Sequence, residues 1–281
     1  MPDPSSKFDG ASEIEEVVAR SGVTQLRRTW RADQPKATLL LLHGIAEHSG
    51  RYEHVGATLA KAGFSVRAID HHGHGRSGGK RGHVDGIDVF LDDIEDNLSD
   101  LRTAGLPVAL MAHSMGGLLA TTYCVTRSEL PDVLLLSGPA LGAEVPLWQK
   151  VAAPVIGRLA PKTFITSDFD GSLLSSDPDV GARYIADPLR VDGATAGLGQ
   201  TLFTAMKTAN ENITNLSIPT MVLHGGDDRI VPPQFSEPIG EQAIATRQVL
   251  PGLQHEILNE PSWERTLGSF INFASGALAI S

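Results

Sequence analysis

The stretch around Ser114 constrains the fold of this chain more than any other. An apolar run over residues 108–111 predicts a buried strand, and residues 118–120 continue as a helix. A serine on a tight turn from strand to helix exposes its hydroxyl, and such a turn needs small neighbours because the two backbones nearly touch. The small residues here are Ala112, Gly116 and Gly117. The stretch therefore predicts an α/β unit that presents a serine at the end of a strand.

Two residues further along are candidates to activate this serine. A serine hydroxyl is a weak nucleophile at neutral pH, so it needs a base to take its proton and a carboxylate to orient that base. An apolar run over 219–224 precedes Asp228, and another over 247–250 precedes His255. We predict Ser114 as the nucleophile, His255 as the base and Asp228 as the acid.

Asp228 has two competitors for the role of the acid. Asp227 precedes it, but a carboxylate at that position favours hydrogen bonds to turn amides. Glu144 follows the predicted strand 133–136 and is a more remote choice. The order serine, acid, histidine is that of α/β-hydrolases, and the placement of Asp228 directly before Arg229 resembles that superfamily.

Acyl transfer also needs donors for the negative charge that develops on the carbonyl oxygen. One donor is expected from the residue after the nucleophile, Met115. The other is expected from the loop after the predicted strand 38–42, where His43 and Gly44 end the strand. We therefore predict the backbone amides of Ile45 and Met115 as an oxyanion hole.

Strands and helices are expected to alternate along most of the chain, which predicts a mostly parallel central sheet with helices on both faces. The predicted strands cover residues 25–31, 38–42, 65–69, 108–111, 133–137, 220–224 and 247–250. The predicted helices cover 52–61, 89–104, 115–127, 234–243 and 263–273. The sequence thus predicts an α/β-hydrolase fold.

Residues 141–216 interrupt this alternation. The segment is rich in apolar side chains, and five prolines are expected to divide it into short helices and loops. We predict that 141–216 is a helical cap, or lid, inserted over the site, and that residues 1–140 and 217–281 form the core. Apolar stripes usually pack within their own core, yet Leu147, Ile156 and Leu174 are candidates to line an acyl-binding surface.

Longer motifs resemble the monoacylglycerol lipase family, and its bacterial members most. In order, they are His43-Gly-Ile-Ala-Glu-His-Ser-Gly-Arg-Tyr52, Asp70-His-His-Gly-His-Gly-Arg-Ser-Gly-Gly-Lys-Arg81, His113-Ser-Met-Gly-Gly117, Asp168-Phe-Asp, Ser176-Asp-Pro-Asp179, Asp187-Pro-Leu189, His224-Gly-Gly-Asp-Asp-Arg229 and Pro251-Gly-Leu-Gln-His-Glu256. The resemblance runs from about residue 20 to 272 and includes parts of the predicted cap. The departures are Ala112, where glycine is usual, and Ile45, where other members carry a smaller or different residue. The second departure bears on the shape of the pocket and not on catalysis, because Ile45 would contribute its backbone.

The resemblance implies hydrolysis of a monoacylglycerol to glycerol and fatty acid without a cofactor. It implies Ser114, Asp228 and His255 as the catalytic triad. It also implies that Glu47, His48 and Arg51 bind the glycerol end of the substrate or brace the oxyanion loop. The alternative for these polar residues is that they only begin a helix.

Composition limits the partners. The net charge of −10 argues against nucleic acid and anionic membrane surfaces. Cys124 is the single cysteine, so no disulfide forms within the chain. The sequence shows no signal peptide and no run of 18 apolar residues, so a soluble cytoplasmic enzyme is expected. Transient contact of the cap with a lipid surface is a further hypothesis, and the oligomeric state is not readable.

The histidines offer a competing interpretation. Seven of the ten lie between His43 and His83, and imidazole is a common metal ligand. Their spacing matches no metallohydrolase motif and they have no cysteine partners. We predict no metal site.

Other functions remain open on the same scaffold. A general carboxylesterase, a lysophospholipase or an aminopeptidase would use the same serine chemistry. A haloalkane dehalogenase is disfavoured because its nucleophile is an aspartate. Outside catalysis, the fold could serve as a ligand sensor that turns over slowly, and turnover well above about 1 per second would exclude that role.

Overall fold

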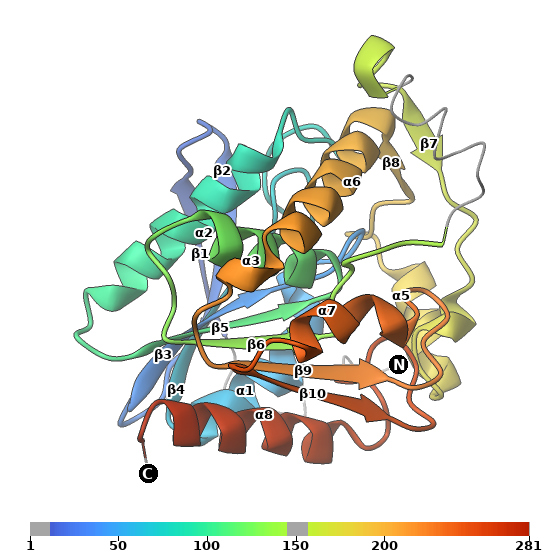
Figure 1. Cartoon of the computed structure of the whole chain (residues 1–281). Coiled ribbons are helices and arrows are strands. Elements are labelled where there is room, and N and C mark those ends of the chain that lie inside the picture. Colours follow the sequence, from blue (N-terminus) through green and yellow to red (C-terminus); the bar gives the residue numbers. More distant parts are fainter. Residues whose placement is uncertain (1–11, 145–156, 281) are drawn as a thin grey trace.

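The computed structural model describes residues 12–144 and 157–280 of the chain. Their main feature is an eight-stranded sheet in the order β1-β2-β4-β3-β5-β6-β9-β10 (Figure 1). The strands are β1 (Glu13–Val18), β2 (Thr24–Trp30), β3 (Ala37–Leu42), β4 (Phe64–Ile69), β5 (Val108–His113), β6 (Val133–Ser137), β9 (Thr220–Gly225) and β10 (Ala245–Leu250). β1 and β2 pair antiparallel, β2 and β4 also pair antiparallel, and every other neighbouring pair is parallel.

The central strands are apolar because both of their faces are covered. Every residue of β3, β5, β6 and β9 is buried. Continuous runs such as Leu39–Leu42 in β3 therefore form strands even though they lack the alternation of a half-exposed sheet. All seven predicted strands occur, and the predicted α/β-hydrolase fold is confirmed.

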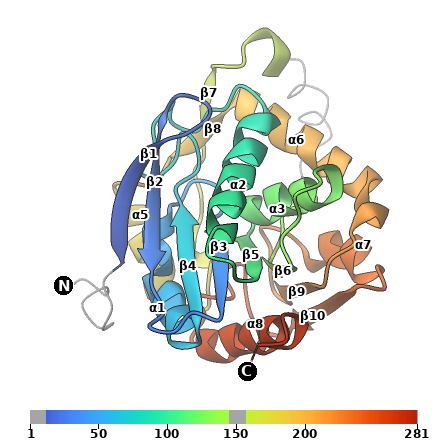
Figure 2. The ribbon, with the colours of Figure 1, turned by 90° about the vertical axis from the view of Figure 1, so that its left-hand side faces the viewer.

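Helices cover both faces of the sheet (Figure 2). α2 (Ile87–Arg102) and α3 (Met115–Thr126) bury apolar side chains against one face. α1 (Glu53–Lys61) and α8 (Trp263–Ala277) bury theirs against the other. The predicted single helix over 234–243 is instead the 3₁₀ turn η5 (Pro233–Ser236) followed by the short helix α7 (Glu237–Gly240). Pro238 lies inside the predicted range and lacks the amide hydrogen that a continuous helix would use there.

The segment between β6 and β9 has more regular structure than the sequence indicated. It contains β7 (Phe164–Thr166), η3 (Gly171–Leu173), α5 (Pro178–Ala186), β8 (Gly193–Thr195), α6 (Ala196–Glu211) and η4 (Ile213–Asn215). The expectation of only short helices and loops was wrong, since α6 has 16 residues and β7 pairs with β8. α6 is long because its sequence has no proline and because Thr195 caps it, with its side chain accepting from Leu198 N–H.

This segment, called the insert below, lies beside the helices of the core. α6 packs in the same apolar cluster as α2 and α3, whereas β7 and β8 lie farther out (Figure 1). The predicted lining residues Leu147 and Ile156 fall outside the described residues. Among the helices of 12–144 and 157–280, none has the length and apolarity needed to cross a membrane.

Candidate active site

Ser114 occupies the turn between β5 and α3. Its φ of 52° and ψ of −115° are values that residues other than glycine rarely adopt. The turn is held by Ser114 N–H, which donates to Ser137 O at 3.0 Å. A Cβ at Gly116 would lie 2.6 Å from the carbonyl oxygens of both Leu42 and His43, so only glycine allows this approach.

His255 and Asp228 complete a hydrogen-bonded chain with this serine. His255 Nε2 lies 2.9 Å from Ser114 Oγ, and His255 Nδ1 lies 2.7 Å from Asp228 Oδ2. All three residues are buried. Asp228 follows β9 and His255 follows β10, so both lie beyond the carboxyl ends of strands, as Ser114 does. The structure thus brings together the three residues that the sequence singled out.

Asp228 accepts four hydrogen bonds. Oδ1 accepts from the amides of Ile230 at 2.9 Å and Val231 at 2.8 Å, and Oδ2 lies 3.2 Å from His224 Nε2 besides its contact with His255. Burial alone would raise the pKa of Asp228, but the hydrogen bonds from His224 and His255 lower it below its usual range. The carboxylate is therefore ionised at neutral pH and can orient the His255 ring.

A second histidine, His113, lies beside the hydrogen-bonded residues Ser114, His255 and Asp228. Its ring centre lies 4.7 Å from that of His255, and its Nδ1 lies 3.0 Å from Ser137 O. Burial, followed by the neighbouring His255, lowers the pKa of His113 to about 3. His113 is therefore neutral at physiological pH, and it adds no positive charge that would oppose protonation of His255.

The loop after β3 comes close to the serine. A Cβ at Gly44 would lie 3.2 Å from Ser114 Cβ. Ile45 lines the pocket, whereas the Met115 side chain is buried in the core, so Met115 could contribute only its backbone. Met115 is the first residue of α3, and its amide has no acceptor within the helix.

A buried ionic network braces this loop from behind. Glu47 accepts from Gly44 N–H at 2.6 Å and from Arg51 Nη1 at 2.7 Å. Arg51 also binds Glu256 with two parallel bonds of 2.5 and 2.7 Å. Burial would raise the pKa of Glu256, but Arg51 lowers it to about 2, while burial raises the pKa of Glu47 despite Arg51. The network links the residue after His255 to the loop that holds Ile45.

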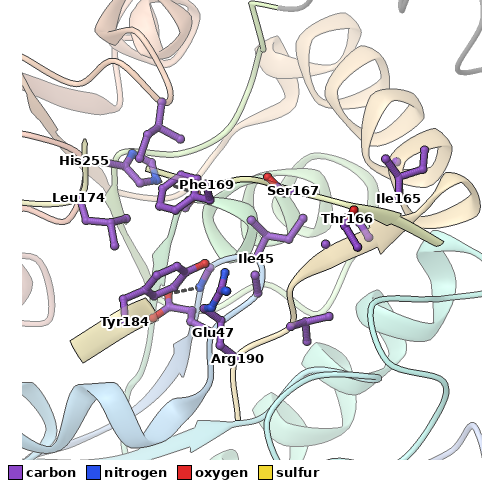
Figure 3. A pocket seen from close by; sticks show the side chains of 18 of the residues that line it. Ile45, Glu47, Ile165, Thr166, Ser167, Phe169, Leu174, Tyr184, Arg190 and His255 are labelled. Carbon is purple, nitrogen blue, oxygen red and sulfur yellow. Dashed lines mark hydrogen bonds between the residues drawn. The ribbon is translucent and has the colours of Figure 1, made fainter. Parts of the chain in front are cut away.

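The serine opens into a pocket of about 610 Å³ between the core and the insert. Figure 3 shows His255 and Leu174 on one side of it and Ile165 and Thr166 on the other. The apolar lining includes Ile45, Ile165, Phe169, Leu174, Val191, Phe203 and Ile230. Polar side chains make up a smaller share of the lining, and Glu47, Tyr184 and Arg190 are among them. An apolar pocket with a few polar groups near a nucleophile fits an ester with a hydrocarbon chain.

The residues predicted to bind substrate do not share one location. Glu47 and Leu174 line the pocket at Ser114, as does Ile45, which was predicted as an oxyanion donor. His48 and Arg51 instead line a second cavity of about 450 Å³, where His48 Nε2 lies 2.8 Å from Asp187 Oδ2. Contact of His48 and Arg51 with a substrate remains a prediction.

The histidine-rich stretch packs within the protein. The rings of His43 and His71 lie 4.3 Å apart, and burial lowers the pKa of His71 to about 3 and that of His74 to about 4. Across residues 12–144 and 157–280, no group of three or more His, Cys, Asp or Glu could hold a metal ion.

Sequence reasoning missed several residues of the site. His224 was noted only as preceding the acid, and His113 only as part of a motif, yet both contact the hydrogen-bonded chain. Tyr184 and Arg190 reach the pocket from the insert, where no periodic pattern marked them. For His224 a signal was present, because it ends a predicted strand four residues before Asp228.

A mostly parallel sheet with a serine on the sharp turn after a central strand, and with an acid and a histidine after two later strands, defines an α/β-hydrolase. Comparison with known proteins agrees. A family model described as "Serine aminopeptidase, S33" matches residues 33–262. A monoacylglycerol lipase of Mycolicibacterium smegmatis is 34% identical over 88% of this chain and 91% of its own length. The chain belongs to the monoacylglycerol lipase-like family of α/β-hydrolases and is a serine hydrolase.

Two further similarities support this assignment. The crystal structure of a monoacylglycerol lipase from Paleococcus ferrophilus superposes with a TM-score of 0.82 at 31% identity, covering 89% of this chain and 98% of that one. A Bacillus subtilis protein named phospholipase YtpA is 29% identical over 84% of this chain and 94% of its own length.

Proposed function

We propose that this protein hydrolyses monoacylglycerols to glycerol and a free fatty acid through an acyl-enzyme on Ser114. The observation that carries the proposal is the hydrogen-bonded chain from Ser114 through His255 to Asp228, which opens into a largely apolar pocket. The names of the relatives at 34% and 31% identity favour this substrate class over other esters.

In the proposed mechanism, His255 Nε2 takes the proton of Ser114 as the hydroxyl oxygen attacks the ester carbonyl. Asp228 holds the Nδ1–H tautomer of His255 and stabilises the imidazolium that forms. The amides of Ile45 and Met115 bind the oxyanion of the tetrahedral intermediate. The ester bond then breaks, glycerol leaves with the proton from His255, and water hydrolyses the acyl-enzyme by the same route in reverse.

Residues 141–216 are proposed to act as a cap that binds the acyl chain. Much of the pocket lining comes from this segment, including Ile165, Phe169, Leu174 and Phe203. Burying a hydrocarbon chain against such side chains stabilises the complex by about 0.8 kcal/mol per methylene group. Chain-length preference would then follow from how much of the chain the insert can cover.

The glycerol end is proposed to lie near Glu47, Tyr184 and Arg190, the polar part of the pocket (Figure 3). Burial raises the pKa of Tyr184 to about 12, so its hydroxyl stays neutral and can donate to a glycerol oxygen. The Arg51 guanidinium lies 5.0 Å from the centre of the Tyr184 ring and supports it from behind. In this arrangement Arg51 braces the site without touching the substrate.

The cap is also proposed to make transient contact with lipid surfaces. Leu159 is 80% exposed and Ile165 is 56% exposed, and both belong to the insert. Their exposure suits a substrate that resides in lipid. Co-sedimentation with neutral vesicles should fall when Leu159 is replaced by serine. Equal binding by the native protein and Leu159→Ser would contradict contact of the cap with lipid.

A second candidate is a broader carboxylesterase or phospholipase, which the similarity to the Bacillus subtilis phospholipase favours. The test measures release of fatty acid from mono-, di- and triacylglycerols, a lysophospholipid and short soluble esters at several chain lengths. Rapid cleavage of monoacylglycerol with little from the others supports the proposal. Equal rates on short soluble esters, or a preference for the lysophospholipid, would replace it with the second candidate. Absence of turnover would favour a ligand sensor.

A further inference from the structure

The loop that bears His255 is attached to the insert on both sides of the histidine. In the orientation that satisfies its amide group, the Gln254 side chain donates to the carbonyls of Ser172 at 2.7 Å and Leu173 at 3.1 Å. On the other side, Glu256 N–H donates to Leu174 O at 2.7 Å. The backbone of the insert at 172–174 and the loop at 254–256 are therefore held as one unit.

A fully buried carboxylate lies at the centre of this attachment. Glu260 is 0% exposed. Its Oε1 accepts from the backbone amide of Gln254 at 2.7 Å, and its Oε2 accepts from the backbone amide of Ser176 at 3.0 Å. Oε2 also accepts from the hydroxyl of Ser175 at 3.2 Å and from that of Ser176. One oxygen thus holds the residue before His255, and the other holds the insert.

The cost of burying this carboxylate is what makes its placement informative. A carboxyl group loses its hydrogen bonds to water when it is buried, and hydrogen bonds from the protein must replace them. The donors around Glu260 include two backbone amides, whose positions are set by the chain itself. The carboxylate and these amides therefore hold one another in place. One of the amides belongs to Gln254, the residue directly before His255.

We propose that Glu260 is a positioning residue, which sets the place of the His255 ring relative to Ser114 and couples that place to the insert. The inference rests on the proposed function, because it assumes that His255 is the base. Glu260 lines the second cavity and is absent from the residues around the pocket at Ser114, so it acts through Gln254 without contacting the substrate.

Replacement of Glu260 by glutamine separates this role from simple packing. Glutamine has the same shape but only one acceptor oxygen, so its NH₂ group must face either the Gln254 amide or the Ser176 amide. Serine hydroxyls can rotate to accept a hydrogen bond, but a backbone N–H cannot. One buried amide is therefore left without an acceptor in either orientation.

The test measures turnover per active site. A fluorophosphonate is allowed to react to completion with Ser114, which counts the competent sites, and turnover of a short soluble ester is divided by that count. We expect Glu260→Gln to lower kcat per titrated site by about tenfold, with KM changed by less than about twofold. Glu264→Gln makes the same chemical change at an exposed position four residues later and should leave both constants unchanged.

The outcomes distinguish the positioning role of Glu260 from the proposed function. If Glu260→Gln only reduces the number of titrated sites and each site turns over at the native rate, Glu260 is merely structural and the inference is wrong. If Glu260→Gln does not fold, Ser176→Ala, which removes one donor to the same oxygen, should lower kcat per site by about threefold. Native turnover in that variant would likewise overturn the inference. The proposed function fails separately, if Ser114→Ala keeps turnover.

Discussion

His255 Nδ1 lies 2.7 Å from Asp228 Oδ2, and the same oxygen lies 3.2 Å from Nε2 of the buried His224. Both histidines can donate a hydrogen to this oxygen, because its carboxylate is ionised. The orientation of the His255 ring therefore depends on a carboxylate that four hydrogen bonds hold in place.

Asp228→Asn should lower kcat by a factor on the order of 10⁴, because an amide at this position favours the wrong tautomer of His255. The amide NH₂ group would donate to Nδ1 of His255, which leaves the ring proton on Nε2, the nitrogen that must take the proton of Ser114. Steady-state kinetics on a soluble ester measure the loss. Asp227→Asn is the matched control, since Asp227 is exposed and its side chain lies outside this chain of bonds. A similar loss in the Asp227 variant would contradict the assignment of Asp228.

Ile45→Ala should change substrate selection and leave the chemistry intact. The proposed oxyanion donor is the Ile45 amide, which alanine keeps, whereas the side chain lines the pocket and is 38% exposed. We expect kcat on a short ester within about threefold of the native value, together with a changed KM ratio between 1- and 2-monoacylglycerols. A collapse of kcat on every substrate would mean that the side chain itself shapes the oxyanion loop.

Gly116→Ala should destabilise the turn that presents Ser114. The added Cβ would lie 2.6 Å from two backbone carbonyl oxygens, and neither can move without displacing β3. We expect a loss of about 2–3 kcal/mol in the free energy of unfolding. Gly268→Ala in α8 is the control, because nothing lies within 4 Å of its Cβ position. That variant should gain about 0.5–1 kcal/mol from helix propensity.

Asp93 should make the protein less stable as pH rises toward neutrality. Burial, and then the nearby Asp96, raise the pKa of Asp93 to about 7, above the value of about 3.8 in the unfolded chain. The folded state therefore binds the proton more tightly, and this contribution is complete below about pH 4 and is lost as pH rises to about 7.

Asp93→Asn removes that titration. The stability of this variant relative to the native protein should be higher at pH 8 than at pH 5 by about 3 kcal/mol, because the native protein loses about 2 pH units of proton linkage between pH 5 and the folded-state pKa of about 7. Urea unfolding at the two pH values measures the difference. The exposed Asp33→Asn provides the comparison, and its effect should be equal at both pH values. An equal effect of Asp93→Asn at both values would show that Asp93 is ionised in the folded protein.

The central strands could be predicted from the sequence because each one is a buried apolar run between turn residues. β1 was missed because it is an exposed edge strand of sequence Glu-Ile-Glu-Glu-Val-Val, which pairs with β2 and has no buried apolar face. β7 and β8 have three residues each, too few for a periodic pattern, and their pairing depends on the insert around them.

The residues of the site also fall into two groups, those that the local sequence marks and those that only the fold brings together. Ser114, Asp228 and His255 follow strands, so local sequence marked them, and the parallel sheet brings the strand ends together. The bond from Arg51 to Glu256 and the bonds of Glu260 to Ser175 and Ser176 join segments 205, 85 and 84 residues apart. No local pattern indicates such pairs, because each side chain alone looks like an ordinary polar or charged surface residue.

The most direct test of the account measures glycerol release from a monoacylglycerol by the native protein and by Ser114→Ala. We predict rapid release by the native protein and a loss on the order of 10⁴- to 10⁶-fold in the variant, with an unchanged circular dichroism spectrum and melting temperature. Near-native glycerol release by folded Ser114→Ala would contradict the account, because no acyl-enzyme could form on that residue.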